Sequence, residues 1–397
     1  MRAHFTLVLL LASSCGVQFS PETLVDSLRI LAISSDPPEV SPGQDSEVKV
    51  LFGDPTRVGQ VSTVIWVGCE PDPQDLNRSA CNDASILIKP TLITEYPPGL
   101  KLLGFGPTAH YASTPGVFDV LAPDDVVRHN GSIGQVIAVV IAEDVKVSAM
   151  GDEVKAVFQR IQDHQTPAAI GLTRVVVSEK PDKNENPTIT TLTFDGAPLP
   201  VGARLQVHAG QEVALGVEVP ESSREHYSEL QPAGPVEKQE IVVGAWYSSN
   251  GRFSRERFDV TSTDATTFFA PGSTKFPDDP VPEKRTGQLW LVVRDNRGAQ
   301  AFQQFRFFVC DDALPTPKVT GITAPTMIGD TVQVTGDDMP KVLDILIGGV
   351  ALESSTYSAV RNAFVGFPPD LPPGTYPVTM RGQNCSSVDT GLTYTVP

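Results

Sequence analysis

Positive charge is scarce in this sequence. Its 397 residues include 30 lysines and arginines against 47 aspartates and glutamates, for a formal net charge of −17, and charged residues of both signs make up only 19% of the chain. A surface with this excess of acid repels the phosphate backbone of nucleic acids and the anionic face of membranes. We therefore predict that the protein binds no nucleic acid.

Motifs for catalysis and for metal binding are also missing. The six histidines are scattered, without the H-E-x-x-H or His-x-His spacing of a metal site, and neither a G-x-S-x-G elbow nor a P-loop occurs. Gly104 and Gly106 begin a partial phosphate-loop match, but Pro107 and the lack of a following helix argue against it. The sequence predicts no enzyme activity, no cofactor and no metal site.

Helical patterns are rare. Apolar residues at helical spacing are clearest over residues 151–165, and Pro167 then predicts the end of a short helix. Elsewhere, short runs of β-branched and aromatic residues alternate with turn-forming clusters, to which 32 glycines and 35 prolines contribute. Strands at this spacing, without intervening helices, predict an all-β protein built of antiparallel sandwiches.

The N-terminus has the layout of an export signal. Arg2 precedes an apolar run over residues 5–12, which is too short to span a bilayer, and small residues then stand before Cys15. This arrangement resembles the lipobox of bacterial lipoproteins, although Ala12 stands where leucine is usual. The resemblance implies cleavage before Cys15 and acylation of that residue. An ordinary secretory signal with an unrelated cysteine is the alternative.

We therefore expect residues 1–14 to be a signal peptide and residues 15–25 to be a lipidated tether. More than one acyl chain on Cys15 would hold the protein durably to a membrane. The resemblance places the protein in the bacterial cell envelope, anchored to the outer membrane.

A weak internal repeat divides the rest of the chain into three parts. Each copy reads as a strand, a proline turn, a glycine and a second strand. This order resembles the opening of an immunoglobulin-like sandwich, in which the first strand crosses to the opposite sheet, and proline suits such a crossing because it cannot donate to a ladder. We predict three tandem immunoglobulin-like β-sandwiches, over residues 26–180, 188–310 and 315–397.

Further resemblances refine these three modules. Trp66 and Trp246 fall in the predicted third strands of the first two, where a large aromatic side chain fills a two-sheet core. Residues 289–298 resemble the end of a PKD-type repeat. Residues 317–380 resemble, in order, the strands of an IPT/TIG domain. The whole chain is similar to multi-module lipoproteins of myxobacteria. This similarity implies no particular activity.

Four cysteines remain besides Cys15, an even number in an exported chain. Cys69 and Cys81 flank a polar loop that a local disulfide could close. The sandwich resemblance implies that Cys385, in the last turn of the third module, lies at the same end as Cys310, so that a bridge would join modules two and three. We favour these two bridges among the three possible pairings, and free thiols at Cys310 and Cys385 are the alternative.

The linker at residues 182–187 resembles in part the calcium-binding linker of cadherins. Calcium takes about six to eight oxygen ligands, and the sequence lacks the further acidic motifs that would complete such a set. A polar hydrated linker is the preferred interpretation, and an interdomain calcium site is the alternative.

Display is the function that these features favour. Acyl chains on Cys15 would hold the protein to the envelope while the sandwich loops bind a surface protein or a glycan, without catalysis. Residues 85–130 are the least regular stretch and hence the predicted binding insertion. The alternatives are a polysaccharide-binding or polysaccharide-processing accessory lipoprotein, since IPT/TIG-like modules also accompany such enzymes, and a purely structural spacer.

Overall fold

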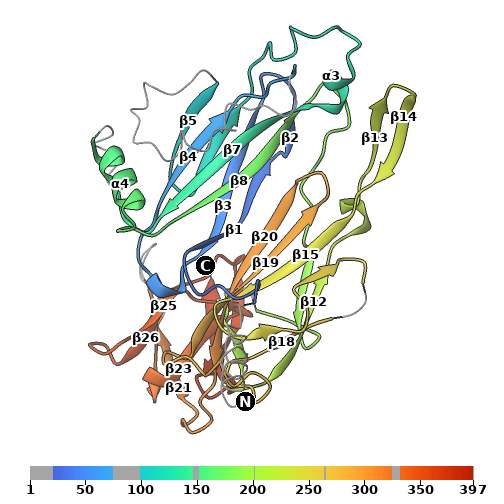
Figure 1. The fold of residues 1–397 in the computed structure, drawn as a ribbon. Coiled ribbons are helices and arrows are strands. Elements are labelled where there is room, and N and C mark those ends of the chain that lie inside the picture. The colour runs from blue at the N-terminus through green and yellow to red at the C-terminus, as the bar shows by residue number, and fades with distance from the viewer. Residues whose placement is uncertain are drawn as a thin grey trace, which may run out of the picture.

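The computed structural model describes residues 21–74, 99–145, 152–200, 202–262, 265–323 and 331–396. In these residues strands dominate, and their sheets stack as three β-sandwiches (Figure 1). The prediction of an all-β chain of immunoglobulin-like sandwiches is confirmed. The signal peptide at residues 1–14 and Cys15 lie outside the described residues and stay predictions, as do the module boundaries drawn from the repeat.

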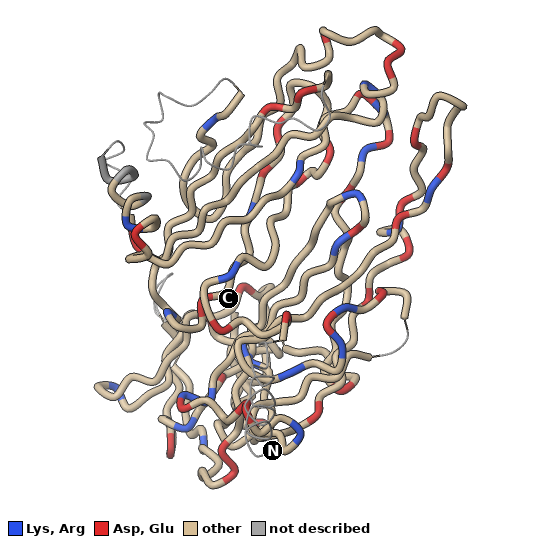
Figure 2. The backbone as a smooth tube through the Cα atoms, viewed as in Figure 1, with Lys and Arg blue, Asp and Glu red and all other residues tan. Residues whose placement is uncertain are grey.

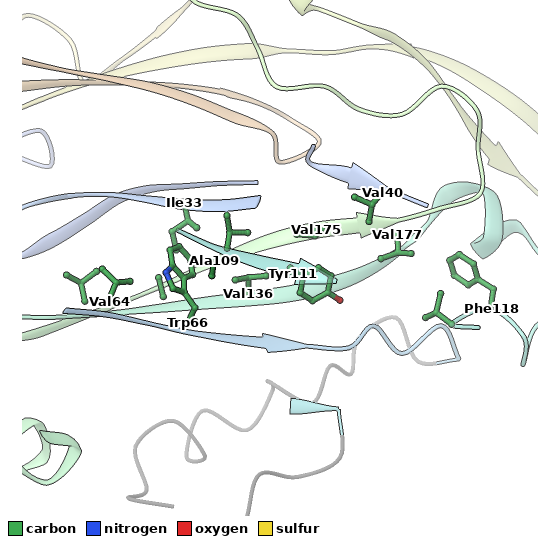
Figure 3. Packing of buried hydrophobic residues seen from close by; sticks show 14 residues of the cluster. Ile33, Val40, Val64, Trp66, Ala109, Tyr111, Phe118, Val136, Val175 and Val177 are labelled. Carbon is green, nitrogen blue, oxygen red and sulfur yellow. The ribbon is translucent and has the colours of Figure 1, made fainter. Parts of the chain in front are cut away.

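The first sandwich stacks a three-stranded sheet on a five-stranded sheet. Figure 3 shows Trp66 between them; the side chain is fully buried and its indole N–H donates to the carbonyl oxygen of Gly106 at 2.8 Å. This tryptophan fills the core as predicted. In sheet order the strands are β1 (Arg29–Asp36), β3 (Asp45–Gly53) and β6 (Thr108–Ala112), and then β2 (Glu39–Val40), β8 (Ala168–Val177), β7 (Ser132–Ile141), β4 (Thr63–Cys69) and β5 (Leu100–Phe105).

The first strand changes sheets at a pair of prolines. β1 pairs antiparallel with β3, and after Pro37 and Pro38 the chain forms β2, which runs parallel to β8 in the opposite sheet. The second sandwich makes the same switch, from β9 (Thr191–Phe194) to β11 (Leu205–Val207), which runs parallel to β20 (Gln300–Val309). The predicted crossing is confirmed in both copies, and its counterpart at residues 324–330 lies outside the described residues.

Two α-helices occur in the described part of the first sandwich. α4 (Asp152–Gln162) confirms the predicted helix, and its Val157 is buried in a cluster with Ile65 and Ile137 on the outer face of the five-stranded sheet. The sequence pattern does not predict α3 (Val126–Asn130), whose first turn is capped when Asp125 accepts the N–H of Val127. Because β5, β6 and α3 fall within residues 85–130, the interpretation of that stretch as irregular is wrong for its described part.

The second sandwich pairs two five-stranded sheets around an aromatic core. Trp246, in the predicted third strand, is 1% exposed and packs with Phe268 and Phe307. The first sheet consists of β10 (Ala197–Pro198), β9, β12 (Glu212–Glu218), β18 (Thr266–Phe269) and β16 (Arg252–Phe253). The second consists of β11, β20, β19 (Thr286–Asp295), β15 (Val242–Ser248) and β17 (Arg257–Asp259).

A hairpin of β13 (His226–Gln231) and β14 (Gly234–Gln239) extends from the second sandwich toward α3 of the first (Figure 1). The side-chain amide of Asn130 both donates to the carbonyl oxygen of Leu230 and accepts its N–H, at 2.8 and 2.9 Å. The hairpin is thereby tied to the neighbouring sandwich.

The third sandwich consists of two four-stranded sheets. Val334, Ile345 and Met380 are fully buried between them. The strands in sheet order are β21 (Lys318–Thr323), β22 (Val332–Asp337), β26 (Ala363–Phe367) and β25 (Glu353–Ser358), and then β24 (Val350–Ala351), β23 (Val342–Ile347), β27 (Gly374–Gly382) and β28 (Ser387–Val396). Short 3-10 helices are η1 (Pro55–Arg57), η5 (Glu221–Ser223) and η6 (Met339–Lys341).

The first and second sandwiches pack side by side through an apolar seam. Trp290 of β19 faces out of its own sandwich and is fully buried in a cluster with Leu31 and Leu51 of the first and with Val25, which precedes the first. Gly53 permits the approach, because a Cβ at that position would lie 3.0 Å from the Trp290 ring. The two sandwiches therefore share a core rather than hanging on a free linker.

Candidate ligand-binding cleft

The predicted cysteine sites fall partly within the described residues. Cys310 and Cys385 form a disulfide with their Cα atoms 5.4 Å apart, which confirms the predicted clip between the second and third sandwiches. Cys69 is fully buried and disulfide-bonded, while Cys81, its predicted partner, lies outside the described residues.

Part of the linker between the first two sandwiches is buried among charged side chains. Asn184 is 2% exposed and donates its backbone N–H to Glu39, which is itself 1% exposed. The Lys180 ammonium and the Arg297 guanidinium lie 3.0 and 2.8 Å from Glu39 Oε2. The interpretation of residues 182–187 as a hydrated linker therefore holds only in part, because Asp182 and Glu185 are exposed whereas Asn184 is buried.

This charged junction does not have the composition of a calcium site. The Arg297 guanidinium also contacts Glu225 at 3.2 Å and Glu240 at 3.0 Å, so that one cation meets three carboxylates. Within the described ranges, no group of three or more His, Cys, Asp or Glu side chains could hold a metal ion. Arginine and lysine supply the positive charge that the cadherin resemblance assigns to calcium.

Burial raises the pKa values of several carboxylates at the same junction. Burial, followed by the nearby charge of Asp295, raises the pKa of Glu240 to about 7. Burial also raises the pKa of Asp295 and that of Glu225. Asp295 Oδ1 accepts three backbone N–H groups of the β19–β20 turn, from residues 297–299. These acids lie largely buried at the junction, so their role is to hold the two sandwiches together.

A cleft of about 750 Å³ opens between the second and third sandwiches. This volume lies within the range of about 300 to 1,000 Å³ that is usual for ligand sites in proteins. β9 and β20 of the second sandwich form one wall, and the β24–β25 segment of the third forms the other. Its apolar surface includes Leu192, Phe194, Leu199 and Phe305.

The cleft exists because the first strand of the second sandwich crosses between sheets. β11 covers only the end of β20 that starts at Phe307, so residues 303–306 of β20 have no strand partner on that edge among the described strands. Pro198 and Pro200 of the crossing segment line the cleft and cannot extend the ladder over it. The open edge therefore presents Gln303, Gln304 and Arg306 to solvent.

A polar clamp fixes the two walls relative to each other. The buried carboxylate of Asp344, on β23, accepts the backbone N–H of Arg204 at 3.2 Å and lies 3.5 Å from the Arg381 guanidinium. Arg381 in turn donates to Gln206 and to the carbonyl oxygen of Arg204, and Gln206 donates to Gly382. With the adjacent disulfide, these contacts hold the cleft open at a fixed width.

The carboxylates of the cleft are not arranged for acid–base catalysis. Glycoside hydrolysis uses two carboxyl groups on either side of the reacting bond. Asp344 is 3% exposed and is held by Arg204 and Arg381, which leaves Glu353 as the one exposed carboxylate of the lining. The cleft can bind and orient a ligand, but it does not offer the pair.

A second, smaller hollow of about 260 Å³ lies where the first sandwich meets the second. Its lining includes Asp54, Arg57 and Gln60 from the first and Gln288 and Gln304 from the second. Gln304 lines both hollows. The two hollows therefore meet at Gln304 on β20.

Sequence reasoning missed the cleft altogether. Its residues come from separate segments between residues 190 and 355, so no local spacing relates them. One signal was available: Asp344 is a lone acid inside an apolar strand, β23, whose residues are all buried. A buried acid needs a partner, and here the partners are the arginines of the clamp.

Comparisons with known proteins add only the fold. No protein-family model and no curated protein matches this chain. Among solved structures, SGBP-B from a mixed-linkage glucan utilization locus of Bacteroides ovatus, in complex with a mixed-linkage heptasaccharide, is 14% identical, with a TM-score of 0.17 over 54% of this chain and 48% of that one. SGBP-B from a complex xyloglucan utilization locus in Bacteroides uniformis is 19% identical, with a TM-score of 0.17 over 51% and 48%.

The N-terminal Ig1-2 module of the Drosophila receptor protein tyrosine phosphatase DLAR is 10% identical, with a TM-score of 0.20 over 72% of this chain and all of that one. The chain spans about half the length of the two Bacteroides structures. At these TM-scores none of the similarities bears on function. In the described part of the chain, no helix is long and apolar enough to cross a membrane.

Proposed function

We propose that the protein is a non-catalytic, glycan-binding protein of the bacterial cell envelope, held to the outer membrane by acyl chains on Cys15. Three sandwiches, over residues 26–180, 188–310 and 315–397, form its body, the last of them IPT/TIG-like. The ligand lies in the cleft between the second and third sandwiches.

The composition of the cleft walls is the observation that supports glycan binding. Sugar rings present apolar faces and a rim of hydroxyls, so they need apolar surface beside planar polar groups. Phe305 and Leu192 supply the first, and the side-chain amides of Gln303 and Gln304 supply the second. The clamp and the disulfide pre-organise the walls, which lowers the entropy lost on binding.

A glycan array with the mature chain tests this proposal. We expect saturable binding to one class of polysaccharide, and the double variant Gln303→Ala, Gln304→Ala to bind it at least about tenfold more weakly, since two hydrogen-bonding side chains are removed. Gln231→Ala, an exposed glutamine of the β13–β14 hairpin, is the matched control. An array without any bound polysaccharide would contradict the proposal.

A further inference from the structure

Arginines outnumber acids around the buried carboxylate of Asp344 at the cleft. Asp344 lies 3.7 Å from the Arg204 side chain and 3.5 Å from that of Arg381, and Arg306 is close enough to act on its charge. Two guanidinium groups thus lie beside a single buried carboxylate, and the charge of a third acts on it from farther away. Burial lowers the pKa of Arg381, and the nearby charge of Arg204 lowers it further.

The first junction has the opposite balance. At the first junction, three carboxylates contact the one guanidinium of Arg297. Arg128 and Arg252 each pair with an acid on the surface, Glu179 and Asp278. Figure 2 shows acidic residues spread over all three sandwiches, in keeping with the net charge of −17. A local excess of arginine in such an acidic chain points to an anionic ligand.

We infer that the ligand of this cleft is a polysaccharide that carries carboxylate groups, as uronic acid residues do, and that Arg306 and Arg204 bind those groups. This inference rests on the proposed glycan-binding function and names the class of glycan. Arg381 lies deeper, is 9% exposed, and keeps Asp344 and Arg204 in place.

Arg306 is the side chain best placed to meet a carboxylate. It is exposed on the open edge of β20, and it makes no hydrogen bond or ion pair within the described part of the chain. Arg204 leaves 27% of its side chain exposed at the same wall. A planar guanidinium binds a carboxylate through two parallel hydrogen bonds, stronger than those between neutral groups.

The remaining acids set limits on this interaction. Glu353 lies exposed on the opposite wall and repels a carboxylate ligand, so the anionic group belongs on the β20 side. Surface acids farther away are screened, because the Debye length is about 8 Å at physiological ionic strength. The cleft can therefore attract a polyanion that the rest of the surface does not.

Titration calorimetry with polygalacturonate and its fully methyl-esterified form tests the inference. We expect the mature protein to bind the acidic polymer at least about tenfold more tightly than the ester, and Arg306→Gln to remove most of that difference. Arg361→Gln, an exposed arginine in the β25–β26 turn of the third sandwich, should leave it unchanged. Glu353→Gln should strengthen binding of the acid form.

The possible failures are distinguishable. Equal affinity for acid and ester, or an Arg306→Gln variant that still prefers the acid, overturns the inference and leaves glycan binding intact. Binding of neutral glycans alone also overturns the inference and leaves glycan binding intact. Equal binding of poly-L-glutamate shows that charge suffices without a sugar and overturns the inference. Failure to bind any glycan overturns the proposed function itself.

Discussion

Arginine is used in opposite ways at the two junctions between sandwiches. At the first junction Arg297 is shared by Glu39, Glu225 and Glu240, Lys180 also contacts Glu39, and acids still outnumber bases. At the second junction one acid, Asp344, is shared by arginines, and positive charge is in excess. The first excess is enclosed and affects stability, whereas the second borders solvent and is available to a ligand.

Glu240 determines how the stability of the first junction depends on pH. Its pKa is raised from 4.5 to about 7, mainly by burial and by Asp295, so the folded chain keeps a proton that the unfolded chain releases at lower pH. This contribution to stability is fully present below the unfolded pKa and is lost as the pH rises through about 7.

We therefore expect Glu240→Gln, which carries no charge at any pH, to become more stable relative to wild type by about 1 to 2 kcal/mol as the pH rises from about 5 to about 8. Neighbouring cations and solvent screening reduce the effect below the full value of the pKa shift. Denaturant unfolding at a series of pH values measures it, with Glu237→Gln on the exposed hairpin as control. A stability difference between Glu240→Gln and wild type that does not change with pH would show that Glu240 titrates normally.

Individual elements follow local rules, and the sequence predicts them well. The crossings at Pro37 and Pro198, the helix α4 and the tryptophans of β4 and β15 all depend on proline chemistry or on periodicity within a short window. The packing of one sandwich on another does not depend on such local rules. Along β19, Leu291 faces the core of its own sandwich and Trp290 faces the next, yet both read as apolar residues of one buried run.

Trp290→Ala tests the seam between the first two sandwiches. Loss of the fully buried ring should destabilise the chain by about 3 to 5 kcal/mol, because a cavity remains where the indole packed. We expect calorimetry to resolve the first sandwich as a separate transition, since it no longer shares a core with the second. Trp290→Phe fills most of the space and should lose less. An unchanged single transition for the alanine variant would contradict the shared core.

The whole molecule combines one closed junction with one open junction. The seam around Trp290 and the charged linker join the first two sandwiches, while the clamp and the Cys310–Cys385 bridge hold the third at an angle that leaves the cleft. The cleft residues could not be predicted from sequence, because they converge only through this packing. The proposed location in the cell envelope, in contrast, is inferred from the sequence alone.

Mass spectrometry of the mature N-terminus tests the proposed anchor. We expect a chain that begins at Cys15 and carries the added mass of a diacylglycerol and an amide-linked acyl chain. Cys15→Ser should abolish that modification and release the protein from membranes. A mature chain that begins elsewhere, or an unmodified Cys15, would contradict membrane anchoring and leave the cleft as a property of an unanchored protein.

The proposed function requires that a glycan occupies the cleft between the second and third sandwiches. Thr190→Trp tests it most directly, because an indole on this exposed wall would fill the cleft without touching the core. With the polysaccharide selected on the array, titration calorimetry should show saturable binding to the wild type and to Thr261→Trp, an exposed position at the far edge of the same sandwich. It should show none to Thr190→Trp. Undiminished binding by Thr190→Trp would contradict the claim.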